Sequence, residues 1–348
     1  MDPNSGLAYY NRGCSYTMMG KDAEALADYS RAIQLEPADR KAYCNRAVTY
    51  ARMAMYEESL VDSNRAIELD PTDASAYCNR GATYEALGKY AEALADCERA
   101  IEIDFMLSDA YLNRAEIYVK VGSLEEAVRD YDRAIELRPE HELRYYSLAP
   151  NIADVYYRRG VTYYSLKRYQ GALTDFAQAI ELSPNDSKSY NYRGMTYAKL
   201  GDREKALADY DRSIELDPLH GLVYYNRANL YFAVNKYAMA LADYSRAIDL
   251  DPNLMIAYTN RGNTYGVLGK LENALADYTH ALQMDPHYAL TYVNIGVLYC
   301  DAGQLERALP YFEKAAAMGN ATGAQAAAEV RRRLGSAGKG FLGRLFGR

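Results

Sequence analysis

Asparagine recurs at a fixed interval along much of this 348-residue chain. Its amide both donates and accepts hydrogen bonds, which is what the backbone of an extended peptide needs from a binding surface. Asn is also a mediocre residue in the middle of a helix, so its recurrence needs a reason other than helix propensity. The column contains Asn11, Asn45, Asn79 and Asn113, then Asn226, Asn260 and Asn294, with 34 residues between neighbours in each group. We treat it as a candidate hydrogen-bonding surface.

Arginine and aspartate recur with the same period. One residue beyond the asparagine column stands an Arg in eight places, and an Asp follows each Arg by 16 residues. Such a pair would clamp two helices together, because loss of one partner leaves a charge unpaired. The expected pairs are Arg12–Asp28, Arg46–Asp62, Arg80–Asp96, Arg114–Asp130, Arg159–Asp175, Arg193–Asp209, Arg227–Asp243 and Arg261–Asp277. This second column predicts a structural role and not a catalytic one.

Catalytic chemistry has little support in the sequence. The four histidines, His141, His220, His280 and His287, lack metal-ligand spacing. No phosphate-binding loop, nucleophile elbow or dinucleotide fingerprint occurs. We predict no enzyme, no cofactor and no metal site.

The elements that position these residues are helix pairs. The triplet Asn11-Arg12-Gly13, or a variant of it, recurs in nine 34-residue repeats that run from Gly6 to Thr322, with eleven extra residues after the fourth. Apolar residues at repeat positions 4, 8 and 11, then 20, 24, 27, 28 and 30, show the spacing of two amphipathic helices. Tyr occupies positions 4 and 11 in all nine repeats. Gly between the helices and Pro at position 32 end the first and second helix, respectively.

The composition narrows the class of protein. The net charge of −7 and pI of about 5.3 disfavour nucleic acid as a partner. The sequence contains neither an apolar run long enough to span a membrane nor a secretory signal. Five cysteines without a C-x-x-C pair argue against disulfides and zinc. We expect a cytoplasmic protein with reduced thiols.

The repeat resembles the tetratricopeptide (TPR) repeat. The resemblance rests on the small residue at position 8, Tyr at 11, Ala at 20, an aromatic residue at 24, Ala at 27 and Pro at 32. It implies an all-α fold, a right-handed α-solenoid of nine helix pairs with a C-terminal capping helix. Tyr replaces the family's frequent Trp at position 4, and Arg replaces its frequent Leu at position 7.

The resemblance also implies that the first helices line a concave face, with positions 2, 5, 6, 9 and sometimes 12 or 13 pointing inward. The asparagine column is position 6, and it resembles the ladder that grips substrate backbones in the TPR region of O-GlcNAc transferase. Further candidates for peptide binding are Asn229 and Asn263 at position 9 and Tyr10, Tyr157 and Tyr225 at position 5. The alternative is a solvated position inherited through duplication. Arg158 and Tyr192 interrupt the column. Position 5 is never Lys, which disfavours a clamp for chaperone C-termini.

The chain divides into five parts on this interpretation. Repeats one to four occupy residues 1–139 and repeats five to nine occupy 151–322, separated by a linker or short helix at 140–150. Residues 323–334 form the capping helix, and 335–348 form a flexible tail that is basic and apolar. The opening Asp2-Pro3-Asn4 resembles the end of an earlier repeat, so a fragment of a longer protein is one expectation.

These observations predict a non-catalytic scaffold that binds an extended segment of a partner protein. One alternative is an assembly factor that docks on a membrane surface through residues 335–348. Another is the substrate-recruiting region of a larger glycosyltransferase. The sequence gives no basis for predicting the oligomeric state.

Overall fold

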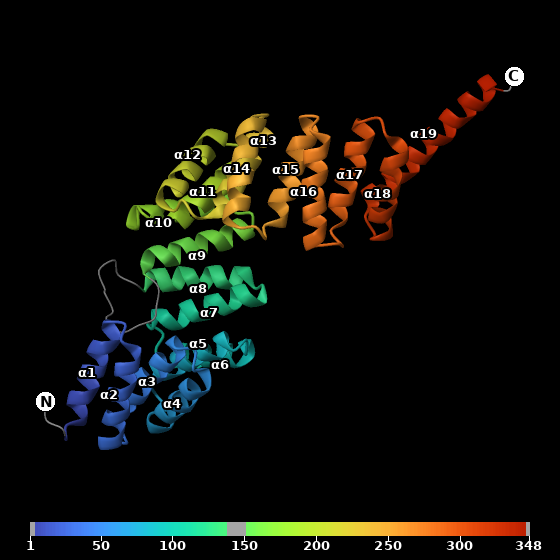
Figure 1. The fold of residues 1–348 in the computed structure, drawn as a ribbon. Coiled ribbons are helices and arrows are strands. Elements are labelled where there is room, and N and C mark those ends of the chain that lie inside the picture. Colours follow the sequence, from blue (N-terminus) through green and yellow to red (C-terminus); the bar gives the residue numbers. More distant parts are fainter. Residues whose placement is uncertain (1–3, 138–150, 346–348) are drawn as a thin grey trace. The chain divides into compact units, whose positions relative to one another are not determined.

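The computed structural model describes residues 4–137 and 151–345, with side chains described as far as Gly335. These residues form nineteen α-helices and no strand. The chain separates into two compact units, Met1–Asn185 and Asp186–Arg348, and Figure 1 labels their helices in chain order. The all-α prediction and the nine helix pairs are confirmed.

The first unit holds repeats one to five. Its first helices are α1 (Gly6–Met18), α3 (Arg40–Arg52), α5 (Ala74–Ala86), α7 (Ser108–Val121) and α9 (Ile152–Ser165). Its second helices are α2 (Asp22–Leu35), α4 (Tyr56–Leu69), α6 (Tyr90–Ile103), α8 (Leu124–Glu136) and α10 (Tyr169–Leu182). Since α8 packs directly on α9, repeats four and five stack together. The predicted linker or helix at 140–150 lies outside the described residues.

The second unit holds repeats six to nine and the cap. Its first helices are α11 (Ser187–Leu200), α13 (Gly221–Ala233), α15 (Met255–Val267) and α17 (Ala289–Asp301). Its second helices are α12 (Arg203–Leu216), α14 (Tyr237–Leu250), α16 (Leu271–Met284) and α18 (Leu305–Ala317), and α19 (Ala321–Leu345) follows them. The boundary between the two units falls in the sequence between repeats five and six, after Asn185.

The turn inside every repeat uses a left-handed residue. Position 15 has a positive φ in all nine repeats, and six of those residues are the predicted glycines. Glycine adopts this conformation without a steric penalty from Cβ. The other three positions are Ala54, Lys167 and Asn235, with φ of 58°, 60° and 60°. Geometry thus demands the turn even where the residue type does not favour it.

Small residues let the two helices of a repeat pack closely. A Cβ added to Gly13 would lie 2.7 Å from the ring of Tyr29, and one added to Gly262 would lie 2.7 Å from the ring of Tyr278. Alanines at positions 20 and 27 are fully buried, as Ala25 shows. The aromatic residue at position 24 fills the space that these small residues leave.

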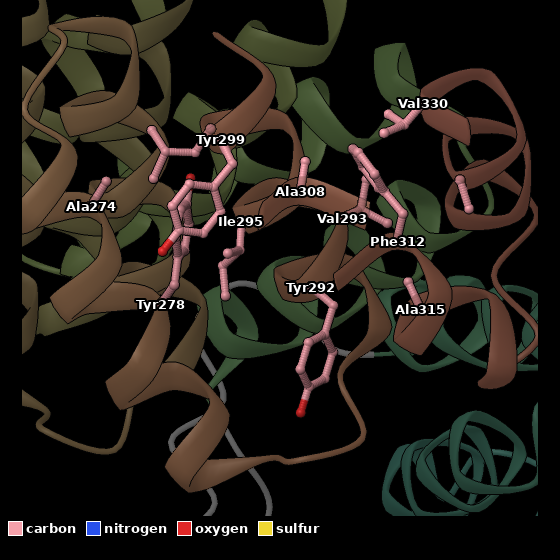
Figure 2. Close-up of a cluster of buried hydrophobic side chains, with 12 residues drawn as sticks. Ala274, Tyr278, Tyr292, Val293, Ile295, Tyr299, Ala308, Phe312, Ala315 and Val330 are labelled. Atoms are coloured by element: carbon pink, nitrogen blue, oxygen red, sulfur yellow. The ribbon is translucent and has the colours of Figure 1, made fainter. Parts of the chain in front are cut away.

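Helix α19 covers the end of the array. Val330 of α19 belongs to the same buried cluster as Phe312 of α18 and Val293 of α17 (Figure 2). Covering this apolar face satisfies the need of a repeat array for a terminal cap. Helix α19 begins at Ala321 and its backbone stays helical through Leu345. No proline interrupts the helix after Leu334, and the spaced glycines weaken a helix without ending it.

The first helices form the inner row of each unit. The backbones of α1 and α3, α3 and α5, and α5 and α7 approach one another, as do those of α11 and α13, α13 and α15, and α15 and α17. Consecutive second helices make no comparable approach in the described part of the chain. The spacing is therefore tighter on the side of the first helices, which is the side that carries the asparagine column.

Candidate functional site

Positions 2, 5, 6 and 9 of the first helices define what we call the inner surface. These positions share one helix face because they are separated by three, four or seven residues. Hydrogen bonds across this face join position 6 of one repeat to positions 5 and 9 of the preceding repeat. Four of the seven asparagine side chains in the column are held in this way.

In the first unit, side chains of the asparagine column donate hydrogen bonds to residues of the preceding repeat. Asn45 Nδ2 donates to Tyr10 Oη at 3.2 Å and to Cys14 Sγ at 3.4 Å. Asn113 Nδ2 donates to the Cys78 carbonyl oxygen at 3.3 Å and to Cys78 Sγ at 3.2 Å. A carbonyl oxygen can only accept, so this contact fixes which side of the Asn113 amide faces the neighbouring repeat.

The second unit repeats the pattern with amide partners. Asn226 Nδ2 donates to Asn191 Oδ1 at 3.1 Å. Asn260 Nδ2 donates to Tyr225 Oη at 3.2 Å and to Asn229 Oδ1 at 2.9 Å. The side-chain nitrogen therefore points toward the preceding repeat, and the side-chain oxygen is the atom left for another molecule.

Arg158 interrupts the asparagine column but makes the equivalent contact. Its Nη1 lies 2.9 Å from Oε1 of Glu116, which stands at position 9 of the preceding repeat. Its Nε donates to Asp154 at 2.6 Å. Position 6 therefore links neighbouring repeats even where its residue type changes. The cost is a charged cluster on the inner surface of repeats four and five.

The asparagines at position 9 are oriented by tyrosines. Tyr244 Oη donates to Asn229 Oδ1 at 2.7 Å, and Tyr278 Oη donates to Asn263 Oδ1 at 2.7 Å. Burial raises the pKa of both phenols, so both remain protonated donors. Since the oxygen of each amide faces the interior, its NH₂ group faces the inner surface.

The remaining predicted asparagines have fewer constraints. No side-chain hydrogen bond joins Asn11, Asn79 or Asn294 to another described residue. Asn11 is exposed, and the other two are half-buried. Neither the C=O nor the NH₂ group of these three side chains is bonded to another described residue, so both groups are available to a ligand.

The predicted tyrosines at position 5 serve as supports as well as surface. The rings of Tyr10, Tyr157 and Tyr225 tilt against the aromatic residue at position 24 of the same repeat, at centroid distances of 6.1, 6.2 and 6.1 Å. Tyr10 and Tyr225 also accept the hydrogen bonds from the column. Each ring is half-buried, so part of it stays accessible.

All eight predicted Arg–Asp pairs are confirmed. Each Arg donates through Nε and Nη2 to both carboxylate oxygens of its Asp, at distances between 2.6 and 2.8 Å. The carboxylates are buried, and this two-point geometry compensates for their loss of water. In five of the repeats Nη1 also reaches position 25 of the preceding repeat, as Arg80 does to Asn64 at 2.6 Å.

Sequence reasoning missed the partners of the column. Cys14, Cys78, Glu116 and Asn191 accept hydrogen bonds from position 6 of the following repeat or lie in an ion pair with it. The signal that could have found them is an offset of 31 or 35 residues, one period adjusted by one helical turn or one residue, which the eleven extra residues lengthen to 42 for Glu116 and Arg158. Cys14, Cys78 and Asn191 are almost fully withdrawn from solvent, at 5%, 4% and 5% exposure.

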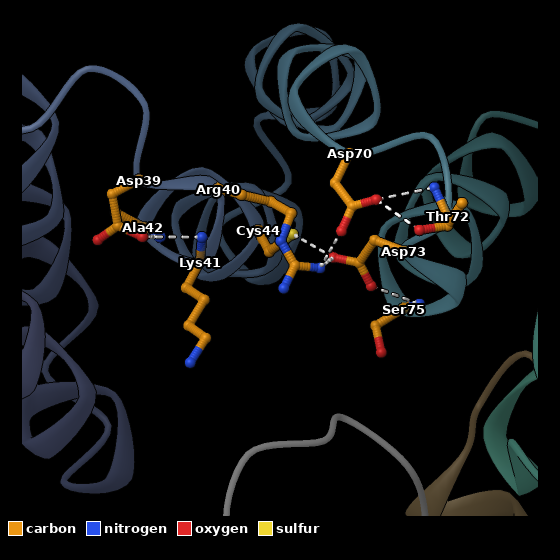
Figure 3. A network of polar contacts seen from close by, with 9 residues as sticks. All are labelled: Asp39, Arg40, Lys41, Ala42, Cys44, Asp70, Thr72, Asp73 and Ser75. Carbon is orange, nitrogen blue, oxygen red and sulfur yellow. Dashed lines mark hydrogen bonds and ion pairs between the residues drawn. The ribbon is translucent and has the colours of Figure 1, made fainter.

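A polar network links repeats two and three at the edge of the inner surface (Figure 3). Arg40 pairs with Asp73, the N-cap of α5, and lies 3.5 Å from Asp70. Cys44 Sγ donates to Asp73 Oδ2 at 3.7 Å. Burial, followed by the nearby Asp73 charge, raises the pKa of the Cys44 thiol to about 12. This thiol is a structural group and a poor nucleophile.

Charge is distributed unevenly along the inner surface. Repeats seven to nine carry no charged residue at positions 2, 5, 6 and 9. The same positions in repeats one to five contain charged residues, namely Lys41, Asp109, Glu116, Asp154 and Arg158.

Within the described ranges, no group of three or more His, Cys, Asp or Glu side chains could hold a metal ion. Nor does any described helix have the length and apolar character to cross a membrane.

Family comparison agrees with this geometry. The tetratricopeptide repeat model matches residues 6–39, 74–104, 108–141, 153–186, 187–219 and 222–254, which is more than half of the chain. The chain belongs to the tetratricopeptide repeat family. Two further TPR models match residues 253–321 and 55–88. The matched segments contain most of the first helices of this TPR protein, and α3 lies outside them.

Solved structures place the TPR chain among known folds. The APC/C hetero-tetramer Cut9–Hcn1 matches at 15% identity with a TM-score of 0.58, over 80% of this chain and 52% of that one. PilF of Pseudomonas aeruginosa matches at 19% identity and a TM-score of 0.52, over 63% and 94%. YrrB, a TPR protein with an unusual peptide-binding site, matches at 27% identity and a TM-score of 0.47, over 56% and 95%. The first two similarities concern the fold alone. A comparison with curated proteins gives no match.

Proposed function

We propose that this TPR protein binds an extended segment of a partner protein along the inner surface, without catalysis. The observation that carries the proposal is the row of amides on the first helices, four of which are held by hydrogen bonds to the preceding repeat: Asn45, Asn113, Asn226 and Asn260. Side chains fixed in advance lose little freedom when a ligand binds, which favours affinity. Amides are also suited to a peptide backbone, which presents both donors and acceptors.

The spacing of the row suits an extended chain. Packed helices lie roughly 8–10 Å apart, and an extended peptide rises about 3.3 Å per residue. Each rung would therefore meet about every third residue of the ligand. Main-chain contacts of this kind supply affinity, and the neighbouring tyrosines and aliphatic residues supply selectivity.

The test changes three asparagines of the column whose side chains make no hydrogen bond to another described residue. The variant Asn11→Ala/Asn79→Ala/Asn294→Ala leaves the described hydrogen bonds between repeats intact, so its helicity and melting temperature should equal those of the wild type. We expect its partners in cell lysate, measured by quantitative mass spectrometry, to be depleted relative to the wild type. Asn273→Asp, at an exposed position on the second helix α16, is the control and should capture the wild-type set. Unchanged capture by the triple variant would contradict binding at the inner surface.

A further inference from the structure

Hydrogen bonds fix the side-chain amides of Asn229 and Asn260 in opposite orientations. Asn229 Oδ1 accepts from Tyr244 at 2.7 Å and from Asn260 at 2.9 Å. An amide oxygen accepts two hydrogen bonds, so only the Asn229 NH₂ group remains for a ligand. Asn260 uses its nitrogen toward Tyr225 and Asn229, which leaves its oxygen. The pair therefore presents a donor beside an acceptor.

Neighbouring residues repeat this arrangement. Asn263 Oδ1 accepts from Tyr278 at 2.7 Å, so its NH₂ group also faces the inner surface. Asn226 donates one N–H to Asn191 at 3.1 Å and keeps its oxygen available. Position 9 thus supplies donors, and position 6 supplies acceptors, on two consecutive first helices, α13 and α15. An extended backbone likewise presents C=O and N–H groups in alternation along one edge.

The residues around these amides are apolar. Leu222, Ile256 and Leu290 occupy position 2 of repeats seven, eight and nine, and Val297 occupies position 9 of repeat nine. Leu222, Leu290 and Val297 are each 46% exposed. No charged side chain stands at positions 2, 5, 6 or 9 of these three repeats. A charged ligand residue would lose water here without gaining a countercharge, which is unfavourable.

We propose that repeats seven to nine bind an uncharged, apolar stretch of a partner in extended conformation. The backbone carbonyls of the stretch accept from the NH₂ groups of Asn229 and Asn263. Its backbone N–H groups donate to the oxygens of Asn226 and Asn260, and its apolar side chains pack on Leu222, Leu290 and Val297. This inference rests on the proposed function and assigns the ligand class and the site within the inner surface. At the spacings given above, three neighbouring first helices can contact about seven residues of an extended peptide.

The orientation of the amides allows a nearly isosteric test. In Asn229→Asp, a carboxylate oxygen still accepts from Tyr244 and Asn260, but the group that faces the ligand changes from a donor to a negatively charged acceptor. Asn263→Asp makes the same change beside Tyr278. Both variants keep the described hydrogen bonds, so we expect wild-type helicity and melting temperature. Asn273→Asp adds the same charge outside the inner surface and is the matched control.

The probe is a phage-displayed library of random dodecapeptides, selected on the full chain and measured afterwards as synthetic peptides. We expect the selected peptides to share an uncharged, apolar core, and to bind Asn229→Asp and Asn263→Asp at least tenfold more weakly than the wild type or Asn273→Asp. Leu222→Lys, which changes an exposed side chain, should shift selection toward acidic peptides. This variant keeps the test decisive should either Asp variant lose stability.

The contrary outcomes separate the two proposals. Selected peptides with a charged core, or peptides that bind Asn229→Asp as tightly as the wild type, would overturn the assignment to repeats seven to nine. If those peptides were lost instead on Asn11→Ala/Asn79→Ala, the proposed function would stand and the site would lie in the first unit. Peptides indifferent to both sets of variants would overturn the inference and the proposed function together.

Discussion

Asn260 Nδ2 lies 2.9 Å from Asn229 Oδ1, so an amide of one repeat is bonded to an amide of the repeat before it. The 34-residue period places the two residues 31 apart in sequence, and the stacking of α13 and α15 brings them together. One residue of the asparagine column therefore helps to hold the array together and also presents its oxygen on the inner surface.

Members of the same column should differ in their contribution to stability. Asn260→Ala removes two hydrogen bonds, and we expect a loss of about 1–2 kcal/mol in the free energy of unfolding. Asn294→Ala removes no side-chain bond to a described residue and should change it by less than about 0.5 kcal/mol. Urea denaturation followed by circular dichroism measures both. Equal losses would show that the bonds between repeats do not stabilise the array.

The Arg–Asp pairs should be strongly coupled. Arg80→Leu leaves the buried Asp96 carboxylate without its partner, and we expect a loss of about 3–5 kcal/mol. Arg80→Leu with Asp96→Leu removes both charges and should be less destabilising than the single substitution. Thermal and urea unfolding of the four proteins in this cycle give the coupling energy. Additive effects would contradict a coupled pair.

Replacing the turn residue of repeat two should increase the stability of the protein. Ala54 has a φ of 58°, whereas repeats with Gly at this position reach the same conformation without a Cβ. We expect Ala54→Gly to stabilise the protein by about 1 kcal/mol, because the left-handed conformation is unfavourable for Ala by about that amount. Gly88→Ala, the reverse change in repeat three, should destabilise it by a similar amount. Melting temperatures that move together would argue against the conformational explanation.

Thiol reactivity should depend on folding and on pH. Burial raises the pKa of Cys44 and of Cys97 to about 12 in each case. At pH 8 their thiolate fraction should be about a thousandfold below that of an ordinary cysteine, and their modification should accelerate as the pH rises toward 12. Mass spectrometry after brief alkylation identifies each site. The protein unfolded in guanidinium is the control, and all five cysteines should react there. Rapid alkylation of Cys97 in the folded protein would contradict its assignment as a buried thiol.

The Arg–Asp column was predictable because both partners belong to one repeat. Arg80 and Asp96 lie 16 residues apart on the two helices of a single pair, and the helix–turn–helix geometry brings them together in every copy. The six αL turns with glycine and the prolines were predictable for the same reason, since a local conformation favours a particular residue type.

The hydrogen-bond partners of the asparagine column could not be predicted in this way. Its partners lie in the preceding repeat and vary in type, from Tyr10 and Cys14 to Asn191 and Asn229. No residue type marks them, so periodicity finds the donors and misses the acceptors. Glycines likewise do not specify the end of the last helix, because glycine lowers helix propensity without fixing where a helix stops.

The sequence alone determined the period, the helix pairs, the bonds within each repeat and the membership of the TPR family, because each follows from spacings within one 34-residue unit. The tertiary structure decided how the repeats contact one another: which side of each amide faces its neighbour, which thiols are buried, and which atoms of Asn229 and Asn260 remain for a ligand. Those properties depend on the stacking of consecutive repeats, and the spacing within a single repeat carries no information about its neighbour's side chains.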